Sequence, residues 1–138
     1  MASPQLKKIL RNMRKTATTP REKVLPALLQ SAHELAAMQR ALAPVDIGNL
    51  RQSIAVTAPG QTTPPYSQPG GNRVAGATET IVSAGDDQAR YTHLVEFGAP
   101  QAAAQPFFWP VYRLLRKRII GRINRTAKKA IRDEWNRP

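Results

Sequence analysis

The sequence of 138 residues predicts an α+β fold, in which a small antiparallel sheet packs against helices. Three observations lead to this fold class. Apolar residues recur at helical spacing near both ends of the chain, whereas the middle holds two short segments rich in β-branched residues. A Pro/Gly-rich stretch connects these two segments. Because the chain has the length of one typical domain, we expect residues 1–138 to form a single domain.

Residues 1–18 are predicted to form a basic amphipathic helix. Four apolar residues follow the i, i+3, i+4, i+7 spacing of a single helix face: Leu6, Ile9, Leu10 and Met13. Basic side chains surround this apolar stripe, and three of them are candidates for docking on a partner or for facing DNA: Lys7, Lys8 and Arg11. Thr18-Thr19-Pro20 is predicted to interrupt the helix, because proline is poorly tolerated in a helix interior.

A second helix is predicted over residues 20–43. Thr19 suits its N-cap, Pro20 suits its first position, and Glu22 lies where a capping box needs a carboxylate. Apolar residues then keep helical spacing to the end of this range. Pro26 is expected to kink the helix or to move its start one turn later.

The sheet is predicted within residues 52–98. Residues 52–57 and 78–84 are rich in Ile, Val and Thr and are bounded by Gly or Pro, which is typical of strands. Residues 59–73 connect them, and seven of the first thirteen residues of this connection are Pro or Gly. Such a segment buries too little apolar surface to offset its conformational entropy, so we expect a long, mobile hairpin loop.

The segment from Tyr91 to Phe97 fits two structures. Its apolar residues have the spacing of a helical turn in the first half, whereas His93, Val95 and Phe97 alternate as in a strand. A short run of this kind does not decide between the two. The preferred prediction is a turn that leads into a strand ending at Gly98.

A long amphipathic C-terminal helix is predicted over residues 107–135, with Pro110 in its first turn. Seven residues form its apolar stripe: Tyr112, Leu115, Ile119, Ile123, Ala127, Ala130 and Ile131. Basic residues occupy the opposite arc, and four of them are further candidates for docking or for facing DNA: Arg118, Arg122, Arg125 and Lys129. A plain solvated face is the alternative interpretation of this arc.

The net charge of +12 comes from the two ends of the chain. Residues 1–23 hold seven basic side chains and one acidic one, and residues 106–138 hold ten basic and two acidic ones. The residues between them hold four basic and six acidic side chains. An excess of this size requires an acidic partner or a neighbour that tolerates it.

The sequence contains no arrangement typical of an enzyme or of a metal site. Cys is absent, and the two histidines, His33 and His93, lie far apart in the sequence. No phosphate-binding glycine motif and no nucleophile motif is present. We therefore predict a protein that is not an enzyme and that uses no cofactor and no metal. No apolar run approaches the length of a membrane span, so we expect no membrane association.

Two local patterns stand out from the rest of the sequence. The first, Ala-Pro-x-Asp-x-Gly-x-Leu-x-x-Ser-Ile, runs from Ala43 to Ile54. The second consists of Tyr-x-x-x-Val-Glu-Phe-Gly from Tyr91 to Gly98, followed by Gln-Pro-Phe-x-x-Pro at residues 105–110. Turn chemistry and core packing alone would also explain both patterns.

In this order and spacing, the patterns resemble the small neck and tail-component family of lambdoid long-tailed bacteriophages. The resemblance covers roughly residues 20–130. It implies a structural virion protein of head-tail joining or tail completion, with no catalytic residues. Twelve motif residues are the expected subunit contacts: Pro44, Asp46, Gly48, Leu50, Arg51, Ser53, Tyr91, Glu96, Phe97, Gly98, Pro106 and Phe107.

The resemblance also implies an oligomer and its partners. The expected assembly is a homo-oligomeric ring around the DNA channel, with sixfold symmetry favoured and twelvefold symmetry as the alternative. Its neighbours would be neck, portal-adaptor or tail-tube proteins, with non-specific contact to packaged DNA. The protein would then be located in the neck or tail of the virion, and in the host cytoplasm during assembly.

The alternative function is that of a basic protein that binds nucleic acid without sequence preference. Lysine and arginine neutralise phosphates and release counterions, so such binding weakens steeply with salt. A DNA-reading or RNA-reading signature is absent from the sequence. A third interpretation places the cationic ends on an anionic membrane, although their apolar stripes have the size needed to cover a core.

Overall fold

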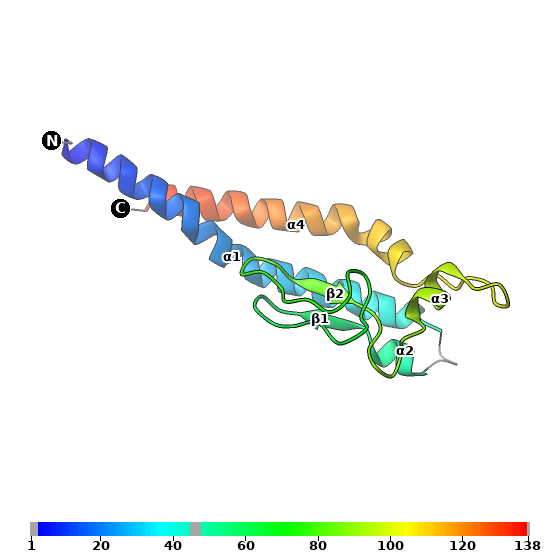
Figure 1. The fold of residues 1–138 in the computed structure, drawn as a ribbon. Coiled ribbons are helices and arrows are strands. Elements are labelled where there is room, and N and C mark those ends of the chain that lie inside the picture. Colours follow the sequence, from blue (N-terminus) through cyan, green and yellow to red (C-terminus); the bar gives the residue numbers. More distant parts are fainter. Residues whose placement is uncertain (1–2, 45–47, 138) are drawn as a thin grey trace.

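The computed structural model describes residues 3–44 and 48–137. In chain order, its elements are α1 (Pro4–Leu42), α2 (Gly48–Gln52), β1 (Ala55–Thr57), β2 (Ile81–Ser83), α3 (Thr92–Phe97) and α4 (Trp109–Trp135). The two long helices, α1 and α4, run antiparallel and pack together (Figure 1). The sheet and the short helices gather around the C-terminal part of α1 (Figure 1). The predicted α+β class is confirmed.

Helix α1 is continuous where two helices were predicted. Ser3 is its N-cap and accepts a hydrogen bond from the Leu6 N–H at 3.2 Å, with Pro4 in the first turn. The predicted interruption at Thr18-Thr19-Pro20 is wrong, because Pro20 and Pro26 both lie inside the helix. Tertiary packing overrides the cost of the two prolines, since α4 packs along this part of α1. Figure 1 shows α1 bending along this part of its length.

The sheet consists of β1 and β2, paired antiparallel with Val56 opposite Val82. Both strands are shorter than the predicted segments 52–57 and 78–84. The first is shorter because Gln52 ends helix α2 and the chain turns before it extends. Ladder pairing continues as isolated bridges, of which one joins Gln68 to Ala84. The Pro/Gly-rich connection therefore pairs with the chain directly after β2.

The connection between the strands is a hydrogen-bonded arm. The Gly60 N–H donates to the Ala75 carbonyl at 3.0 Å, and the Thr63 N–H donates to the Arg73 carbonyl at 2.8 Å. The Gln68 N–H donates to the Ala84 carbonyl at 2.8 Å. Backbone pairing thus holds a segment whose composition predicted only a loop. Its mobility in solution stays a prediction.

One end of the arm is predicted to loosen in acid. Hydrogen bonds from the Gly76 N–H and the Arg73 guanidinium to the Glu79 carboxylate hold its pKa below the ordinary value of 4.5. Because the pKa of Glu79 is lower in the folded chain than in the unfolded chain, its ionised carboxylate stabilises the fold fully above the unfolded pKa. This stabilisation is lost as the pH falls through the folded pKa. The amide NMR signal of Gly76 should therefore shift during acid titration below about pH 4.5. A signal that stays constant through this range would contradict the pairing.

The segment from Tyr91 to Phe97 forms a helix, α3, so the preferred strand prediction is wrong. The helical spacing of its apolar residues was the correct alternative. The turn before the helix is held by Asp86, whose carboxylate accepts the Gln88 and Ala89 N–H groups at 2.9 Å each. Thr92 follows by donating its hydroxyl to the Ala89 carbonyl at 2.8 Å. These local bonds favour a helix start over an extended strand.

Helix α4 closes the core along α1. Its most buried apolar residues are Val111, Leu115 and Ala130, four or more residues apart on the row that faces α1. The predicted stripe is confirmed at Leu115 and Ala130, whereas Tyr112 and Ile131 are exposed. A cluster with Phe107 and Leu50 at its centre joins the start of α4 to the sheet. Among the described residues, no helix has the length and hydropathy that would cross a membrane.

Candidate functional site at the start of helix α4

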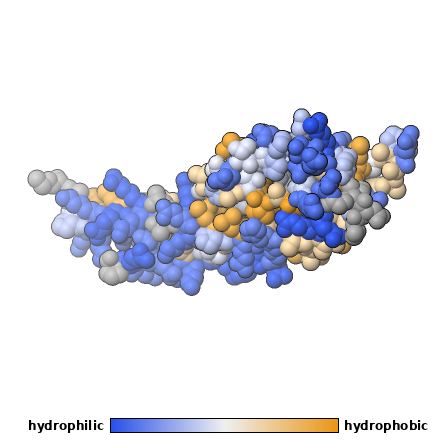
Figure 2. Space-filling view, turned by 90° about the horizontal axis from the view of Figure 1, so that it is seen from below, coloured by the Kyte–Doolittle hydropathy of each residue, from blue (hydrophilic) through white to orange (hydrophobic). Residues whose placement is uncertain are grey.

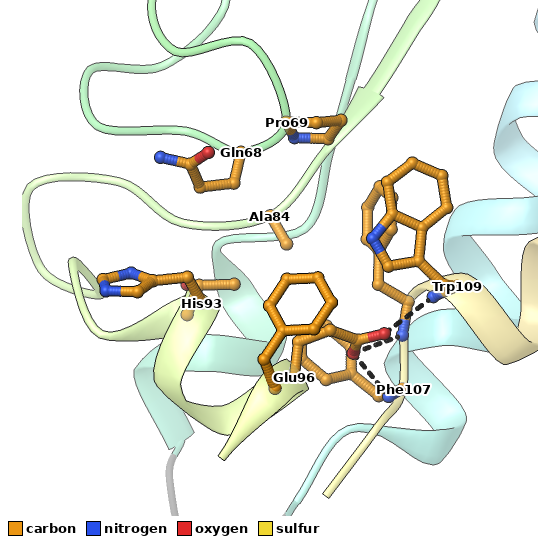
Figure 3. A pocket seen from close by; sticks show the side chains of 10 residues that line it. Gln68, Pro69, Ala84, His93, Glu96, Phe107 and Trp109 are labelled. Atoms are coloured by element: carbon orange, nitrogen blue, oxygen red, sulfur yellow. Dashed lines mark hydrogen bonds between the residues drawn. The ribbon is translucent and has the colours of Figure 1, made fainter. Parts of the chain in front are cut away.

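The sequence motifs meet at one corner of the molecule, where α3 approaches the first turn of α4 (Figure 3). The Glu96 carboxylate accepts three backbone N–H groups there, from Phe107 at 2.9 Å, Phe108 at 3.1 Å and Trp109 at 3.0 Å. Helix α4 begins with Phe108 as its N-cap, whose side chain makes no capping bond. Glu96, from a separate helix, therefore caps α4 and places a negative charge at the positive end of its dipole.

Gly98 returns the chain from α3 toward α4. It has φ +85°, and a Cβ at this position would lie 3.1 Å from the Ala104 nitrogen. The Gln105 N–H then donates to the Val95 carbonyl at 2.8 Å, which closes the loop between the two halves of the second motif. Glycine is needed here because the loop backbone passes so close.

The first motif is tied to the same corner through Ser53. Its hydroxyl donates to the Leu50 carbonyl at 2.6 Å and accepts the Gly85 N–H at 2.9 Å. Gly85 follows β2 and has φ +101°, and a Cβ there would lie 2.9 Å from the Thr92 hydroxyl oxygen. One buried serine thus joins the end of α2, the end of the sheet and the approach to α3.

The C-terminal part of α1 supplies two further ties. Gln39 is fully buried and donates its side-chain amide to the Phe108 carbonyl at 3.1 Å. Arg40 donates to the Ile54 carbonyl at 2.7 Å. These residues satisfy buried carbonyl groups of both motifs, so the corner is held from α1 as well.

An apolar hollow of about 140 Å³ opens at this corner (Figure 3). Phe107, Phe108 and Trp109 line it together with residues of α3 and of the arm. An apolar cavity of about 150 Å³ accommodates benzene, so this hollow has room for one aromatic or branched side chain. Figure 3 shows the Glu96 carboxylate turned toward the α4 backbone and His93 pointing away from it. The hollow is suited to holding an apolar group.

Four of the expected subunit contacts lie inside the chain. Leu50 and Phe107 have no exposed surface, Ser53 is 2% exposed and Glu96 is 7% exposed. Their contacts are the intramolecular ones described above, so the expectation that they contact another subunit is corrected.

The remaining motif residues differ in exposure. Phe97 is 72% exposed beside the hollow, and Pro106 is exposed. Four others are half-buried: Pro44, Arg51, Tyr91 and Gly98. Gly48 begins α2, and Asp46 lies outside the described residues. Phe97 is therefore the motif side chain that the structure leaves most available to a neighbour.

The basic candidates occupy two separate surfaces. Lys7, Lys8 and Arg11 are exposed on the first turns of α1. Arg118, Arg125 and Lys129 are exposed on α4. The expected place of Arg122 on the outer arc is wrong. Its side chain is only 17% exposed and lies on the side of α4 that faces α1.

Arg122 joins α4 to α1 through Glu34. It donates to the Glu34 carboxylate at 2.8 Å and to the Ser31 hydroxyl at 3.0 Å, and Arg118 approaches the same carboxylate at 3.3 Å. Arg122→Ala should therefore lower the free energy of unfolding by about 1 to 2 kcal/mol in urea denaturation. Arg125→Ala, at an exposed position of the same helix, is the control and should change it by less than about 0.5 kcal/mol. Equal losses from the two variants would contradict the inward role of Arg122.

No group of His, Asp or Glu residues that could hold a metal ion occurs in residues 3–44 and 48–137. Sequence reasoning also missed two residues of the corner, Gln39 and Gly85. Gln39 lies on the buried face of a predicted helix, and a polar residue at such a position was the available signal. Gly85 precedes Asp86 and Asp87, and local sequence carries no sign of its close approach to Thr92.

One family model matches the chain. It carries the description "Bacteriophage HK97-gp10, putative tail-component" and matches residues 7–98, which is two thirds of the chain. The matched region includes most of α1, the sheet and the whole of α3, and it ends at the glycine that turns the chain toward α4. No curated protein and no solved structure matches the chain significantly.

Proposed function

The chain belongs to the HK97-gp10-like family of bacteriophage tail components, and we propose that it forms a ring in the neck or tail that joins head to tail or completes the tail. As a tail component it is a structural protein of the virion and interacts with other tail or neck proteins. The family match is the observation that carries this proposal. It spans the sheet and α3, which form the corner beside α4.

The surface of the chain supports assembly into a ring. A ring needs two different faces on each subunit, so that one copy contacts the next head to tail. The hollow beside Phe97 supplies one apolar face. The outer side of α4 supplies another, where Leu114 is 70% exposed and Ile120 is 45% exposed. Exposed apolar groups on separate faces are typical of association surfaces. Sixfold symmetry is the favoured arrangement, with twelvefold symmetry as the alternative.

The proposal is tested with particles made without this protein. A phage with the gene inactivated should yield filled heads beside separate tails in electron micrographs if the protein joins head to tail. Incomplete or overlong tails would assign it to tail completion. Infectious particles of normal form would contradict both roles. Supplying the intact protein from a plasmid is the control for effects on neighbouring genes.

Phe97→Ala is predicted to separate assembly from stability. The side chain is 72% exposed, so its loss should change the free energy of unfolding by less than about 0.5 kcal/mol. If the ring contact includes the hollow, the yield of joined particles should fall at least about tenfold, as expected for an interface anchor. Val74→Ala, at another exposed apolar position, is the control and should leave the yield unchanged. Normal assembly of the Phe97 variant would exclude this residue from the contact.

The observation that favours the alternative function is the exposed basic side of α4. Arg125, Lys129 and Arg132 are exposed on it along with other cations. Binding to duplex DNA should then weaken with salt by about 0.9 log unit per log unit of salt for each phosphate contact. Replacing Arg125, Lys129 and Arg132 with Glu should weaken such binding strongly without unfolding the chain. If this variant still assembles into infectious particles, the basic side of α4 is dispensable for tail function.

A further inference from the structure

The first turns of α1 extend past the end of α4. Figure 1 shows this part of α1 standing clear of the rest of the molecule, beyond the C-terminal end of α4. Within residues 3–17, every side chain is exposed except those of Asn12 and Thr16, which are half-buried. Four apolar side chains share one face of this segment: Leu6 (45% exposed), Ile9 (47%), Leu10 (44%) and Met13 (55%). Figure 2 shows a small hydrophobic patch at this largely hydrophilic end.

A helix segment of this kind is poorly stabilised by the chain itself. Isolated helices shorter than about 12 to 15 residues are marginal in water, and helices in proteins are stabilised mainly by packing of an apolar face. Its first turn contains no acidic residue, and Lys7 and Lys8 follow at once. Cations near the positive end of a helix dipole are unfavourable. A partner that covers the apolar face would stabilise the helix, and negative charge on that partner would offset the cations near the positive end of the dipole.

The basic and neutral polar residues of this segment lie on different edges of the apolar stripe. At 3.6 residues per turn, Lys7 and Arg14 follow one edge of the stripe, whereas Gln5 and Asn12 follow the other. Lys8 lies on the opposite side of the helix. A complementary surface would therefore present an apolar row with carboxylates along one of its edges.

The composition of residues 3–17 distinguishes the kinds of partner that could cover their apolar stripe. Residues 3–17 contain five basic residues and no acidic residue, so two copies of this segment would repel each other. Duplex DNA would neutralise the cations but would leave the apolar stripe in water. An acidic protein surface with an apolar row satisfies both features.

We infer that residues 4–17 of α1 dock on an acidic amphipathic surface of a neighbouring neck or tail protein. This inference rests on the proposed function, because it takes the neighbour from the same virion. The contact resembles a helix in a groove, with apolar anchors at i, i+3, i+4 and i+7 and charged pairs beside them. Electrostatic attraction speeds the encounter, and the apolar stripe sets the register of the bound helix.

Site-specific crosslinking in phage particles tests the contact. A photoreactive phenylalanine analogue replaces Met13 in the full chain, particles are purified and irradiated, and the crosslinked peptides are identified by mass spectrometry. The expected product joins the analogue at position 13 to a segment of a different virion protein that is rich in Asp and Glu. A crosslink to a second copy of this chain, a crosslink to DNA, or no crosslink would overturn the inference.

The same analogue at Lys8 is the matched control, because Lys8 lies on the opposite side of the segment. Its crosslinking yield should be at least about tenfold lower, and equal yields would contradict docking through the apolar stripe.

A second variant, Ile9→Asp with Met13→Asp, should lower incorporation into particles at least about tenfold. Its thermal midpoint should stay within about 2 °C, because both side chains project from the folded body. Normal incorporation would overturn the inference.

Absence of the unsubstituted protein from purified particles has a different meaning. That result would contradict the proposed function itself. Presence of the protein without a Met13 crosslink would contradict only the docking inference.

Discussion

Glu96→Ala is expected to lower the free energy of unfolding by about 3 kcal/mol, measured by urea denaturation of the purified chain. The carboxylate accepts three backbone N–H groups at 2.9 to 3.1 Å and is 7% exposed. Without it, the first turn of α4 keeps buried donors that have lost their acceptor. The loss also removes the negative charge at the start of a helix of 27 residues.

Two further variants, Glu96→Gln and Glu79→Ala, show whether the loss of stability in Glu96→Ala comes from the buried carboxylate. Glutamine keeps one acceptor oxygen but turns an amide donor toward another N–H, so its cost should approach that of alanine. Glu79 also accepts a backbone N–H, at 3.1 Å from Gly76, but its side chain is 42% exposed, so its replacement should lower the free energy of unfolding far less than Glu96→Ala does. A Glu96→Ala variant as stable as the unsubstituted chain would contradict the capping role.

Gly85→Ala should lower the free energy of unfolding by about 3 kcal/mol, because the added methyl group has no room. The residue has φ +101°, a conformation that L side chains rarely adopt. An added Cβ would lie 2.9 Å from the Thr92 hydroxyl oxygen and 3.1 Å from the Tyr66 carbonyl oxygen. Neither the backbone carbonyl nor the bonded threonine can move without breaking other contacts of the corner.

Gly71→Ala is the matched control for this substitution. Gly71 has φ +66°, but its Cβ would meet nothing within 4 Å. Gly71→Ala should therefore lower the free energy of unfolding by only about 1 kcal/mol, the cost of a left-handed backbone conformation for an L residue. Thermal unfolding of the two variants separates steric crowding from backbone conformation, and equal losses would contradict the crowded environment of Gly85.

The long helices were predictable because their apolar spacing continues over many residues. Leu115 and Ala130 illustrate this on α4, since both were assigned to its buried stripe and both are buried. The interruption at Pro20 was wrong for a physical reason. Packing between α1 and α4 compensates for the proline, and this packing is not visible in local sequence.

Short segments were less predictable because few residues carry their pattern. In α3, three alternating residues suggested a strand, but the bonds of Asp86 and Thr92 start a helix. Glu96 was identified as a motif residue, yet its capping of α4 depends on residues 11 to 13 positions later in the sequence. Arg122 was placed on the wrong side of α4, because its partner Glu34 is 88 positions away. Long-range polar contacts of this kind leave no periodic signal.

Two buried motif residues, Ser53 and Glu96, stabilise the fold of the chain itself. Together with Gly85, which lies outside the motifs, they hold α2, the sheet and both later helices at fixed positions. A rigid corner of this kind would hold the exposed Phe97 and the apolar hollow in a defined relation. The motif residues inside the chain thus position the surfaces that we propose to contact neighbours.

Localisation of the chain in purified virions tests the central claim most directly. Cryo-electron microscopy of the neck and tail, combined with quantitative mass spectrometry, would give the position and the number of copies. We predict a ring of identical subunits around the DNA channel, with six copies favoured over twelve. Infectious virions that contain no copy of this chain would contradict the account.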